Sequence, residues 1–322
     1  MQCMEVWGGN QRVDSGVEMA AGLDAWVFSE PYQGDAGGGD VHYVSSCATG
    51  RIVRLLVADI AGHGAGVADI AAGLRKLMRR YVNHVDQSRF LKAINREYPT
   101  ISSAGRFATA TAATFWGPTS DLIICNAGHP APLWYQARKS RWRYLDQDLP
   151  GAGGGELANA PLGLLDLTRY DQWRVRLAKD DLVLFYTDSM IEATRSDGKQ
   201  LGLDGFLSMV RTLDAARPHE FVSSLIAQVQ RFKGVQAWED DVTLLLVKPN
   251  GRNPRMTLRE RFESNVRMAG ALLRSMKPGG EPMPWPELSY YNIFGALVPG
   301  VNERFGKHEG RTGEDEQEPR AD

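Results

Sequence analysis

The order of the apolar runs along the chain limits the possible folds more than any other feature. Short runs typical of strands follow one another directly, and the helical patterns come in two blocks instead of between successive strands. Regular strand–helix–strand alternation would indicate a parallel sheet, whereas strands joined by short turns indicate antiparallel pairing. The sequence therefore predicts an α+β protein, with antiparallel sheets and helices packed outside them.

The expected elements follow from hydrophobic periodicity and turn residues. Apolar residues from Val67 to Tyr81 recur at three- and four-residue steps, which predicts a helix, and further helices are expected at 87–96, 203–214 and 219–232. The expected strands are 23–29, 41–47, 52–60, 107–116, 121–125, 131–135, 142–145, 171–177, 182–187 and 242–247.

Composition excludes several classes of partner. The 322 residues are 43% hydrophobic and 24% charged, which suits a packed globular core, and the net charge of -2 gives no electrostatic reason to expect nucleic acid. The N-terminus lacks the pattern of a signal peptide. No window approaches the roughly 18 continuous apolar residues that span a bilayer. We therefore expect a cytoplasmic protein with no nucleic-acid or membrane partner.

Four aspartates share a position relative to the expected strands. Asp40 and Asp240 stand just before strands, and Asp59 and Asp188 stand at the ends of strands. A single aspartate at such a place is as readily a turn former. Four at the ends of different strands favour a shared site, since carboxylates are the ligands of hard cations such as Mg²⁺ and Mn²⁺. Such ions activate water as a nucleophile at neutral pH.

Short motifs then occur in a fixed order over some two hundred residues. They resemble the PPM-type metal-dependent serine/threonine protein phosphatases, in the bacterial branch typified by SpoIIE and RsbU. Each motif alone is weak, but their order is specific. The motifs are Gly38-Gly-Asp40, Val57-Ala-Asp-Ile-Ala-Gly-His-Gly64, Asn126-Ala-Gly-His-Pro130, Pro161-Leu-Gly163, Tyr186-Thr-Asp-Ser-Met-Ile-Glu-Ala193 and Asp240-Asp-Val-Thr243.

The resemblance implies a four-layer α-β-β-α sandwich of two mainly antiparallel sheets flanked by helices. It places the catalytic domain at residues 23–248, after a short N-terminal segment, residues 1–22. The remaining residues, 249–322, would be an extension with one helix near 258–276 and a largely disordered, charged tail.

The resemblance also implies a centre of two Mn²⁺ or Mg²⁺ ions. Asp59 would bridge both ions, and the carbonyl oxygen of Ile60 would be a further ligand. Asp188 and Asp240 would hold one ion. Asp40 would contact the centre directly or through water, so Asp59 and Asp40 are the catalytic candidates.

Other residues of the motifs are not assigned as metal ligands. Asp241 would neighbour the ligands, and Glu192 belongs to a motif without an assigned role. Ser189 replaces a glycine that is usual in the family, which would cost roughly 1 kcal/mol if the backbone needs a positive φ there. Ala61 occupies the position of a histidine that acts as general acid in eukaryotic members, so His63 is not assigned as the acid.

His129 is a tempting catalytic base, but a structural role is the preferred interpretation. We expect Asn126 and His129 to form local hydrogen bonds in a turn that ends a strand. Thr109 and Thr111 are expected to be strand residues without chemistry of their own.

In the branch that the chain resembles, the usual substrate is a phosphoserine or phosphothreonine on a small STAS-domain protein. We expect such a phosphorylated protein as substrate, and a homodimer stays open. Two other functions remain: an inactive relative that binds a phosphoprotein, favoured by Ser189, and a dinuclear hydrolase of small phosphate esters. The extension would also suit an interaction arm.

Overall fold

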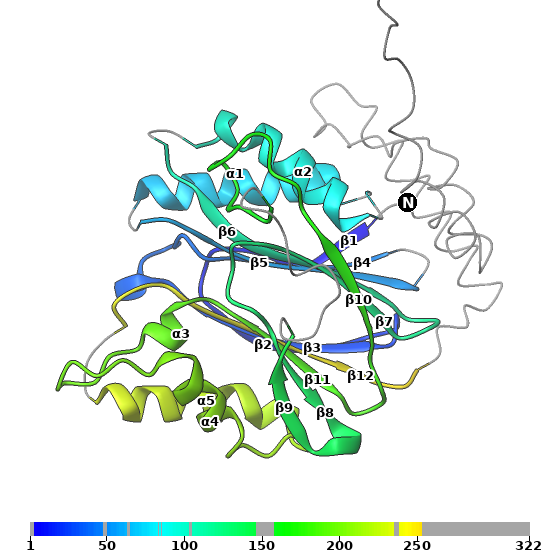
Figure 1. The fold of residues 1–322 in the computed structure, drawn as a ribbon, viewed down its shortest axis with the longest axis vertical. Coiled ribbons are helices and arrows are strands. Elements are labelled where there is room, and N and C mark those ends of the chain that lie inside the picture. The colour runs from blue at the N-terminus through cyan, green and yellow to red at the C-terminus, as the bar shows by residue number, and fades with distance from the viewer. Residues whose placement is uncertain are drawn as a thin grey trace, which may run out of the picture.

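Two six-stranded sheets lie face to face in the computed structural model, with helices on both outer faces (Figure 1). The structure describes residues 3–47, 50–62, 65–82, 84, 86–102, 105–145, 158–234 and 238–252. The helix expected at 258–276 and the charged tail lie outside these residues.

The first sheet runs in the order β1-β4-β5-β6-β7-β10, and all its pairs are antiparallel. Its strands are Cys3–Gly9 (β1), Val41–Cys47 (β4), Ile52–Ile60 (β5), Ala108–Trp116 (β6), Asp121–Ala127 (β7) and Gln172–Arg176 (β10).

The second sheet runs in the order β2-β3-β12-β11-β8-β9, again with antiparallel pairs throughout. Its strands are Val13–Met19 (β2), Leu23–Glu30 (β3), Val242–Pro249 (β12), Leu182–Tyr186 (β11), Leu133–Gln136 (β8) and Arg141–Tyr144 (β9).

The helices form the outer layers, which confirms the predicted four-layer sandwich (Figure 1). Two cover the first sheet: Ala65–Tyr81 (α1) and Gln87–Glu97 (α2). Three lie on the second sheet: Ser189–Glu192 (α3), Gly202–Val210 (α4) and Pro218–Lys233 (α5). Among the described residues, no helix is both long and apolar enough to cross a membrane.

The central strands are buried on both faces, which explains why they read as continuous apolar runs. In β5, Leu56 packs under α1 and α2, while Leu55 and Val57 face the second sheet. In β11, Phe185 faces the first sheet and Leu184 packs under α4 and α5. The alternation along β5 directs Asp59 to the same side as Val57, between the two sheets.

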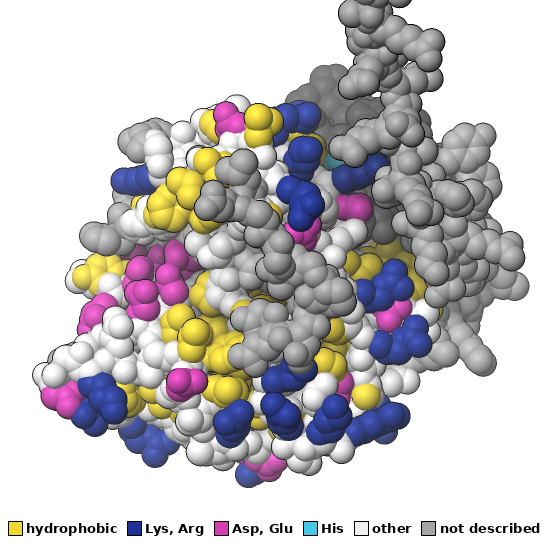
Figure 2. All heavy atoms as spheres, viewed as in Figure 1, with side chains coloured by type: hydrophobic (Ala, Val, Ile, Leu, Met, Phe, Trp, Pro, Cys, Tyr) yellow, Lys and Arg dark blue, Asp and Glu magenta, His cyan; other side chains and the backbone are white. Residues whose placement is uncertain are grey.

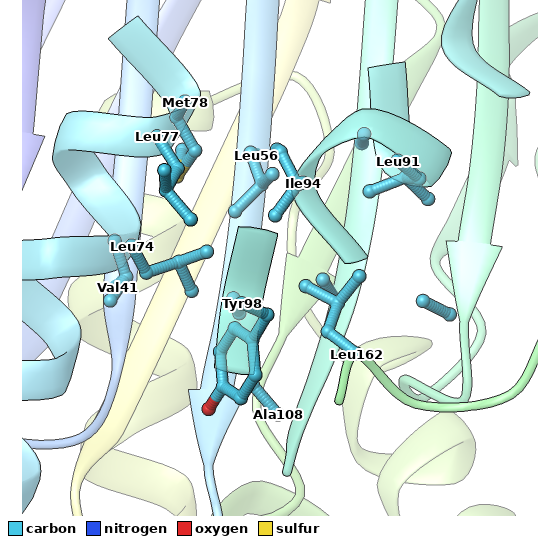
Figure 3. Close-up of a cluster of buried hydrophobic side chains, with 14 of the residues drawn as sticks. Val41, Leu56, Leu74, Leu77, Met78, Leu91, Ile94, Tyr98, Ala108 and Leu162 are labelled. Atoms are coloured by element: carbon cyan, nitrogen blue, oxygen red, sulfur yellow. The ribbon is translucent and has the colours of Figure 1, made fainter. Parts of the chain in front are cut away.

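Aliphatic side chains fill the layer between α1, α2 and the first sheet (Figure 3). Leu74 of α1 and Leu91 and Ile94 of α2 are fully buried there. Tyr98, which follows α2, lies at one end of this cluster, and its hydroxyl points away from the aliphatic side chains (Figure 3). The hydroxyl is buried and has no hydrogen-bond partner in the described part of the chain.

Residues 1–22 were expected to be only a short segment before the domain, yet the described ones form β1 and β2, one edge strand in each sheet. The sequence signal is weak because β1 ends in two glycines and β2 exposes Asp14, Ser15, Gly16 and Glu18. Edge strands of this kind form through pairing with a neighbour that is already in place.

Leu74 supplies the sharpest test of this packing. Leu74→Ala is expected to lower the free energy of unfolding by about 2–5 kcal/mol, because it leaves a cavity between α1 and the sheet. Leu203→Ala, at an exposed position of α4, is the control, and its free energy of unfolding should stay within about 0.5 kcal/mol of the wild-type value. Urea denaturation measures both; equal effects of the two changes would contradict the described core.

Candidate metal centre

The two sheets bring the predicted aspartates to one end of the sandwich. Asp40 precedes β4 and Asp59 lies near the end of β5; Val41 pairs with Ala58, so these two aspartates are adjacent in the register. Asp188 follows β11 and Asp240 precedes β12, and these strands are neighbours in the second sheet. Acidic side chains gather at the edge between the two halves of the sandwich (Figure 2).

Asp40 is buried and contacts the other sheet. Its Oδ2 accepts a hydrogen bond of 2.8 Å from Oγ1 of Thr187, the residue after β11. Burial, followed by repulsion from Asp59 and Asp241, raises the pKa of Asp40 well above its usual range. Among the residues that the structure describes, no cationic side chain is paired with this carboxyl.

Asp59 is the centre of the acidic group. Its pKa is raised to about 8, chiefly by burial and then by repulsion from Asp188, Asp240, Asp241 and Glu192. The pKa of Asp188 is raised as well, first by burial and then by Glu192. Asp240 and Glu192 are exposed at the rim. All the other predicted acids therefore lie within electrostatic range of Asp59.

Asp241 holds the loop that carries Asp40. Its two oxygens accept backbone hydrogen bonds from Tyr32 at 2.6 Å and from Gly39 at 2.5 Å. A Cβ on Gly38 would lie 2.2 Å from Oδ1 of Asp241, so only glycine permits this approach. Asp241 positions the backbone before Asp40, and its oxygens are already engaged.

The backbone after Asp59 is also fixed. Ile60 pairs with Ala108 of β6, and the N–H of Ala61 donates to the carbonyl of Phe107 at 3.0 Å. The carbonyl oxygen of Ile60 lies 3.0 Å from where a Cβ on Gly39 would stand, so it faces the loop of Asp40. His63 lies outside the described residues.

Ser189 does not strain the backbone. It is the first residue of α3 and is absent from the positive-φ residues of the described chain, while Asp188 before it has φ -63° and ψ -25°. The anticipated cost of replacing glycine therefore does not arise. The carbonyl of Asp188 accepts hydrogen bonds from the N–H groups of Ile191 at 2.8 Å and Glu192 at 2.9 Å.

The turn at Asn126 and His129 is structural, as expected. The Asn126 side chain donates to the carbonyl of His129 and accepts from its N–H, both at 2.7 Å. Thr109 and Thr111 lie in β6. Nδ1 of His129 also bonds to Oγ1 of Thr109 at 2.8 Å, and Thr109 is the register partner of Asp59. Burial lowers the pKa of His129 to about 3, so its ring is neutral at pH 7.

Sequence reasoning missed Thr187 and Arg106. Thr187 stands inside a motif, but its contact with Asp40 joins residues of different sheets and has no local signal. Arg106 precedes β6 beside the Ala61–Phe107 contact, is half-buried, and pairs with no carboxylate of the described residues. A Cβ on Gly66, in the first turn of α1, would lie 3.5 Å from its Nη1.

The donors suit a hard divalent cation. They are carboxylate and carbonyl oxygens, which Mg²⁺ and Mn²⁺ prefer. Burial and then mutual repulsion raise the pKa values of Asp40 and Asp59, and a bound cation would favour their charged forms. In the described part of the chain, no three His, Cys, Asp or Glu side chains are already arranged to hold a metal ion. The site therefore brings the acids to one place, and their side chains would rotate inward around an ion.

Comparison with known proteins gives the family. The profile described as Stage II sporulation protein E (SpoIIE) matches residues 49–250, more than half of the chain. Several solved structures share the fold at low sequence identity. The RsbU and RsbW domains of Rv1364c from Mycobacterium tuberculosis are 22% identical with a TM-score of 0.58, over 82% of this chain and 70% of that one.

Two further solved structures share the fold. The SiaA-PP2C domain of Pseudomonas aeruginosa is 19% identical with a TM-score of 0.59, over 70% of this chain and 85% of that one. RsbX, crystallised in complex with magnesium, is 16% identical with a TM-score of 0.53, over 73% and 99%. The chain belongs to the SpoIIE family and is a PP2C-type serine/threonine protein phosphatase.

Proposed function

We propose that this phosphatase hydrolyses phosphoserine and phosphothreonine in proteins with a centre of two Mn²⁺ or Mg²⁺ ions. The observation that carries the proposal is the group of carboxylates that both sheets bring to one place, whose charged forms burial and mutual repulsion make unfavourable in the absence of a cation. The magnesium bound by RsbX, which shares the fold, supports the same kind of ion here.

The proposed ligands are those that the resemblance implies, and the gathering of the acids around Asp59 supports them. Asp59, at the middle of the acidic group, is assigned to both ions, with the carbonyl oxygen of Ile60 beside it. Asp188 and Asp240, from the second sheet, are assigned to one ion. Asp40 contacts the centre directly or through water. Bound cations would supply the acidification of water and the neutralisation of phosphoryl charge that the reaction needs.

The chain's own residues hold this arrangement in place. The hydroxyl of Thr187 fixes the orientation of Asp40 by donating to Oδ2. Asp241 fixes the backbone before Asp40 by accepting from Gly39. A positioned carboxylate loses little freedom when the reacting groups assemble, and such preorganisation is a main source of rate enhancement.

Arg106 is proposed to bind an oxygen of the substrate's phosphoryl group. A phosphate dianion approaching a group of carboxylates needs a cation that the carboxylates have not already paired. Arg106 is half-buried, stands beside the turn after Asp59, and is near the first turn of α1, whose N-terminal end favours anions.

The substrate is proposed to be a small STAS-domain regulator that carries a phosphorylated serine or threonine. The support is the resemblance to the RsbU branch and the fold shared with the RsbU and RsbW domains of Rv1364c. The inactive-relative alternative has lost its main argument, because Ser189 fits the start of α3 without a positive φ.

Asp59→Asn tests the metal centre. Because Asn lacks the charge that would hold the ions, phosphate release from a phosphoserine peptide should fall by at least about a hundredfold, as is typical when a catalytic group is lost. Wild-type activity should require Mn²⁺ or Mg²⁺ and vanish with chelator. Asp214→Asn, at an exposed ion pair, is the control and should keep full activity.

Either chelator-resistant activity or full activity of Asp59→Asn would refute the metal mechanism. Tight metal binding without activity would show a phosphatase that needs a partner. Absence of both would favour the inactive relative.

Arg106→Ala tests the phosphoryl contact. Loss of a charge-assisted hydrogen bond worth about 1.5–3 kcal/mol should raise the KM for phosphopeptide by roughly ten- to hundredfold. Competitive inhibition by inorganic phosphate should weaken in parallel, and Arg106→Lys should recover part of both. Arg12→Ala, at an exposed position before β2, is the control. Unchanged KM and phosphate inhibition in Arg106→Ala would remove this residue from the site.

A further inference from the structure

Exposed leucines are concentrated in one loop beside the acidic group. The described residues expose four large hydrophobic side chains: Leu164 at 53%, Leu165 at 37%, Leu167 at 92% and Leu203 at 51%. A single exposed leucine such as Leu203 on α4 is ordinary. Three leucines within four consecutive residues, with the exposed Asp166 between Leu165 and Leu167, gather apolar surface in one loop, and such gatherings mark places where something binds.

The backbone beneath this patch is firmly held. Leu162 exchanges two hydrogen bonds with Ala108, at 2.9 and 2.7 Å. The Asn95 side chain accepts from the N–H of Gly163 at 2.8 Å and donates to the carbonyl of Leu165 at 2.9 Å. These contacts tie the loop to β6 and α2, so the leucines are held outward by fixed backbone.

Gly163 lets the loop close against the helix layer. Its φ is +80°, and a Cβ there would stand 2.4 Å from the ring of Tyr98. The loop therefore sits directly on the tyrosine that follows α2. Tyr98 and Leu162 belong to the buried cluster beneath the loop, whereas Leu164, Leu165 and Leu167 are exposed.

The patch adjoins the acidic group. Ala108 bridges to Leu162 on one side and pairs with Ile60 on the other, and Ile60 directly follows Asp59. Hydrophobic side chains lie at the surface next to the gathered acidic ones in Figure 2. A polypeptide that places a phosphorylated residue at Asp59 also contacts the neighbouring surface. Since an extended chain advances only about 3.3–3.6 Å per residue, the residues that flank the phosphorylated one stay near this surface.

We propose that Leu164, Leu165 and Leu167 bind an apolar side chain that flanks the phosphorylated serine or threonine of the protein substrate. This inference rests on the phosphatase function proposed above. The flanking residue is apolar because the leucines offer no polar partner and the nearby carboxylates repel acidic side chains. Substrate selection then depends on this surface, while the chemistry depends on the acids.

The experiment uses two synthetic phosphoserine peptides of equal charge and length, one with leucine and isoleucine around the phosphoserine and one with serine and glycine there. Binding is measured by fluorescence polarisation with chelator present, and kcat/KM with Mn²⁺. The wild type should prefer the apolar peptide by roughly tenfold, the discrimination that a lost apolar contact typically gives. The variant Leu164→Ser/Leu165→Ser/Leu167→Ser should lose this preference.

Leu203→Ser is the matched control, because it removes an equally exposed leucine from α4 and should keep the preference. Hydrolysis of p-nitrophenyl phosphate, which has no flanking residues, should be the same in all three proteins and shows that the triple variant is folded. Absence of that hydrolysis in the wild type would count against the phosphatase function itself, while peptide binding would still report on the patch.

Two results would overturn the proposal. One is a preference that persists in the triple variant or is absent from the wild type. The other is a wild-type dimer, seen by sedimentation, that the triple variant loses without any change in peptide preference, because the leucines would then contact a second copy of the chain.

Discussion

Hydrophobic packing between the two sheets brings carboxylates of like charge together, and the site depends on this packing. Val57, Phe115, Phe185 and Leu245 fill the space between the sheets, so the strand ends that carry acids cannot separate. Burial, followed by the resulting repulsion, raises the pKa values of Asp40 and Asp59. Hydrophobic burial thus stabilises an arrangement that electrostatics alone would disperse, as functional sites commonly require.

The layered fold could largely be predicted from the sequence, because strongly apolar segments such as those of β5 and β11 admit few alternatives. The resemblance then specified the sandwich. The N-terminal edge strands β1 and β2 could not be predicted in this way, since β1 pairs with the remote β4 and the residues of both strands carry little strand signal of their own. The short helix α3 was also missed, because a single turn has no periodicity to detect.

The candidate site, too, could be predicted from the sequence only in part. Acids at strand ends leave a local pattern, so Asp40, Asp59, Asp188 and Asp240 were identified, although their role as ligands stays a prediction. The contacts of Thr187 with Asp40 and of Thr109 with His129 join residues far apart in the chain. The surroundings of such residues become visible only when the sheets are assembled.

The first two strands have a consequence beyond the site. They are consecutive in the chain, yet β1 ends one sheet and β2 ends the other, so one short segment covers the backbone edges of both β4 and β3. An uncovered strand edge is a template for pairing between molecules. This N-terminal segment therefore keeps the apolar strands β4 and β3 away from the sheet edges and places a strand with exposed Asp14 and Glu18 at one of them, so its loss would affect solubility as well as folding.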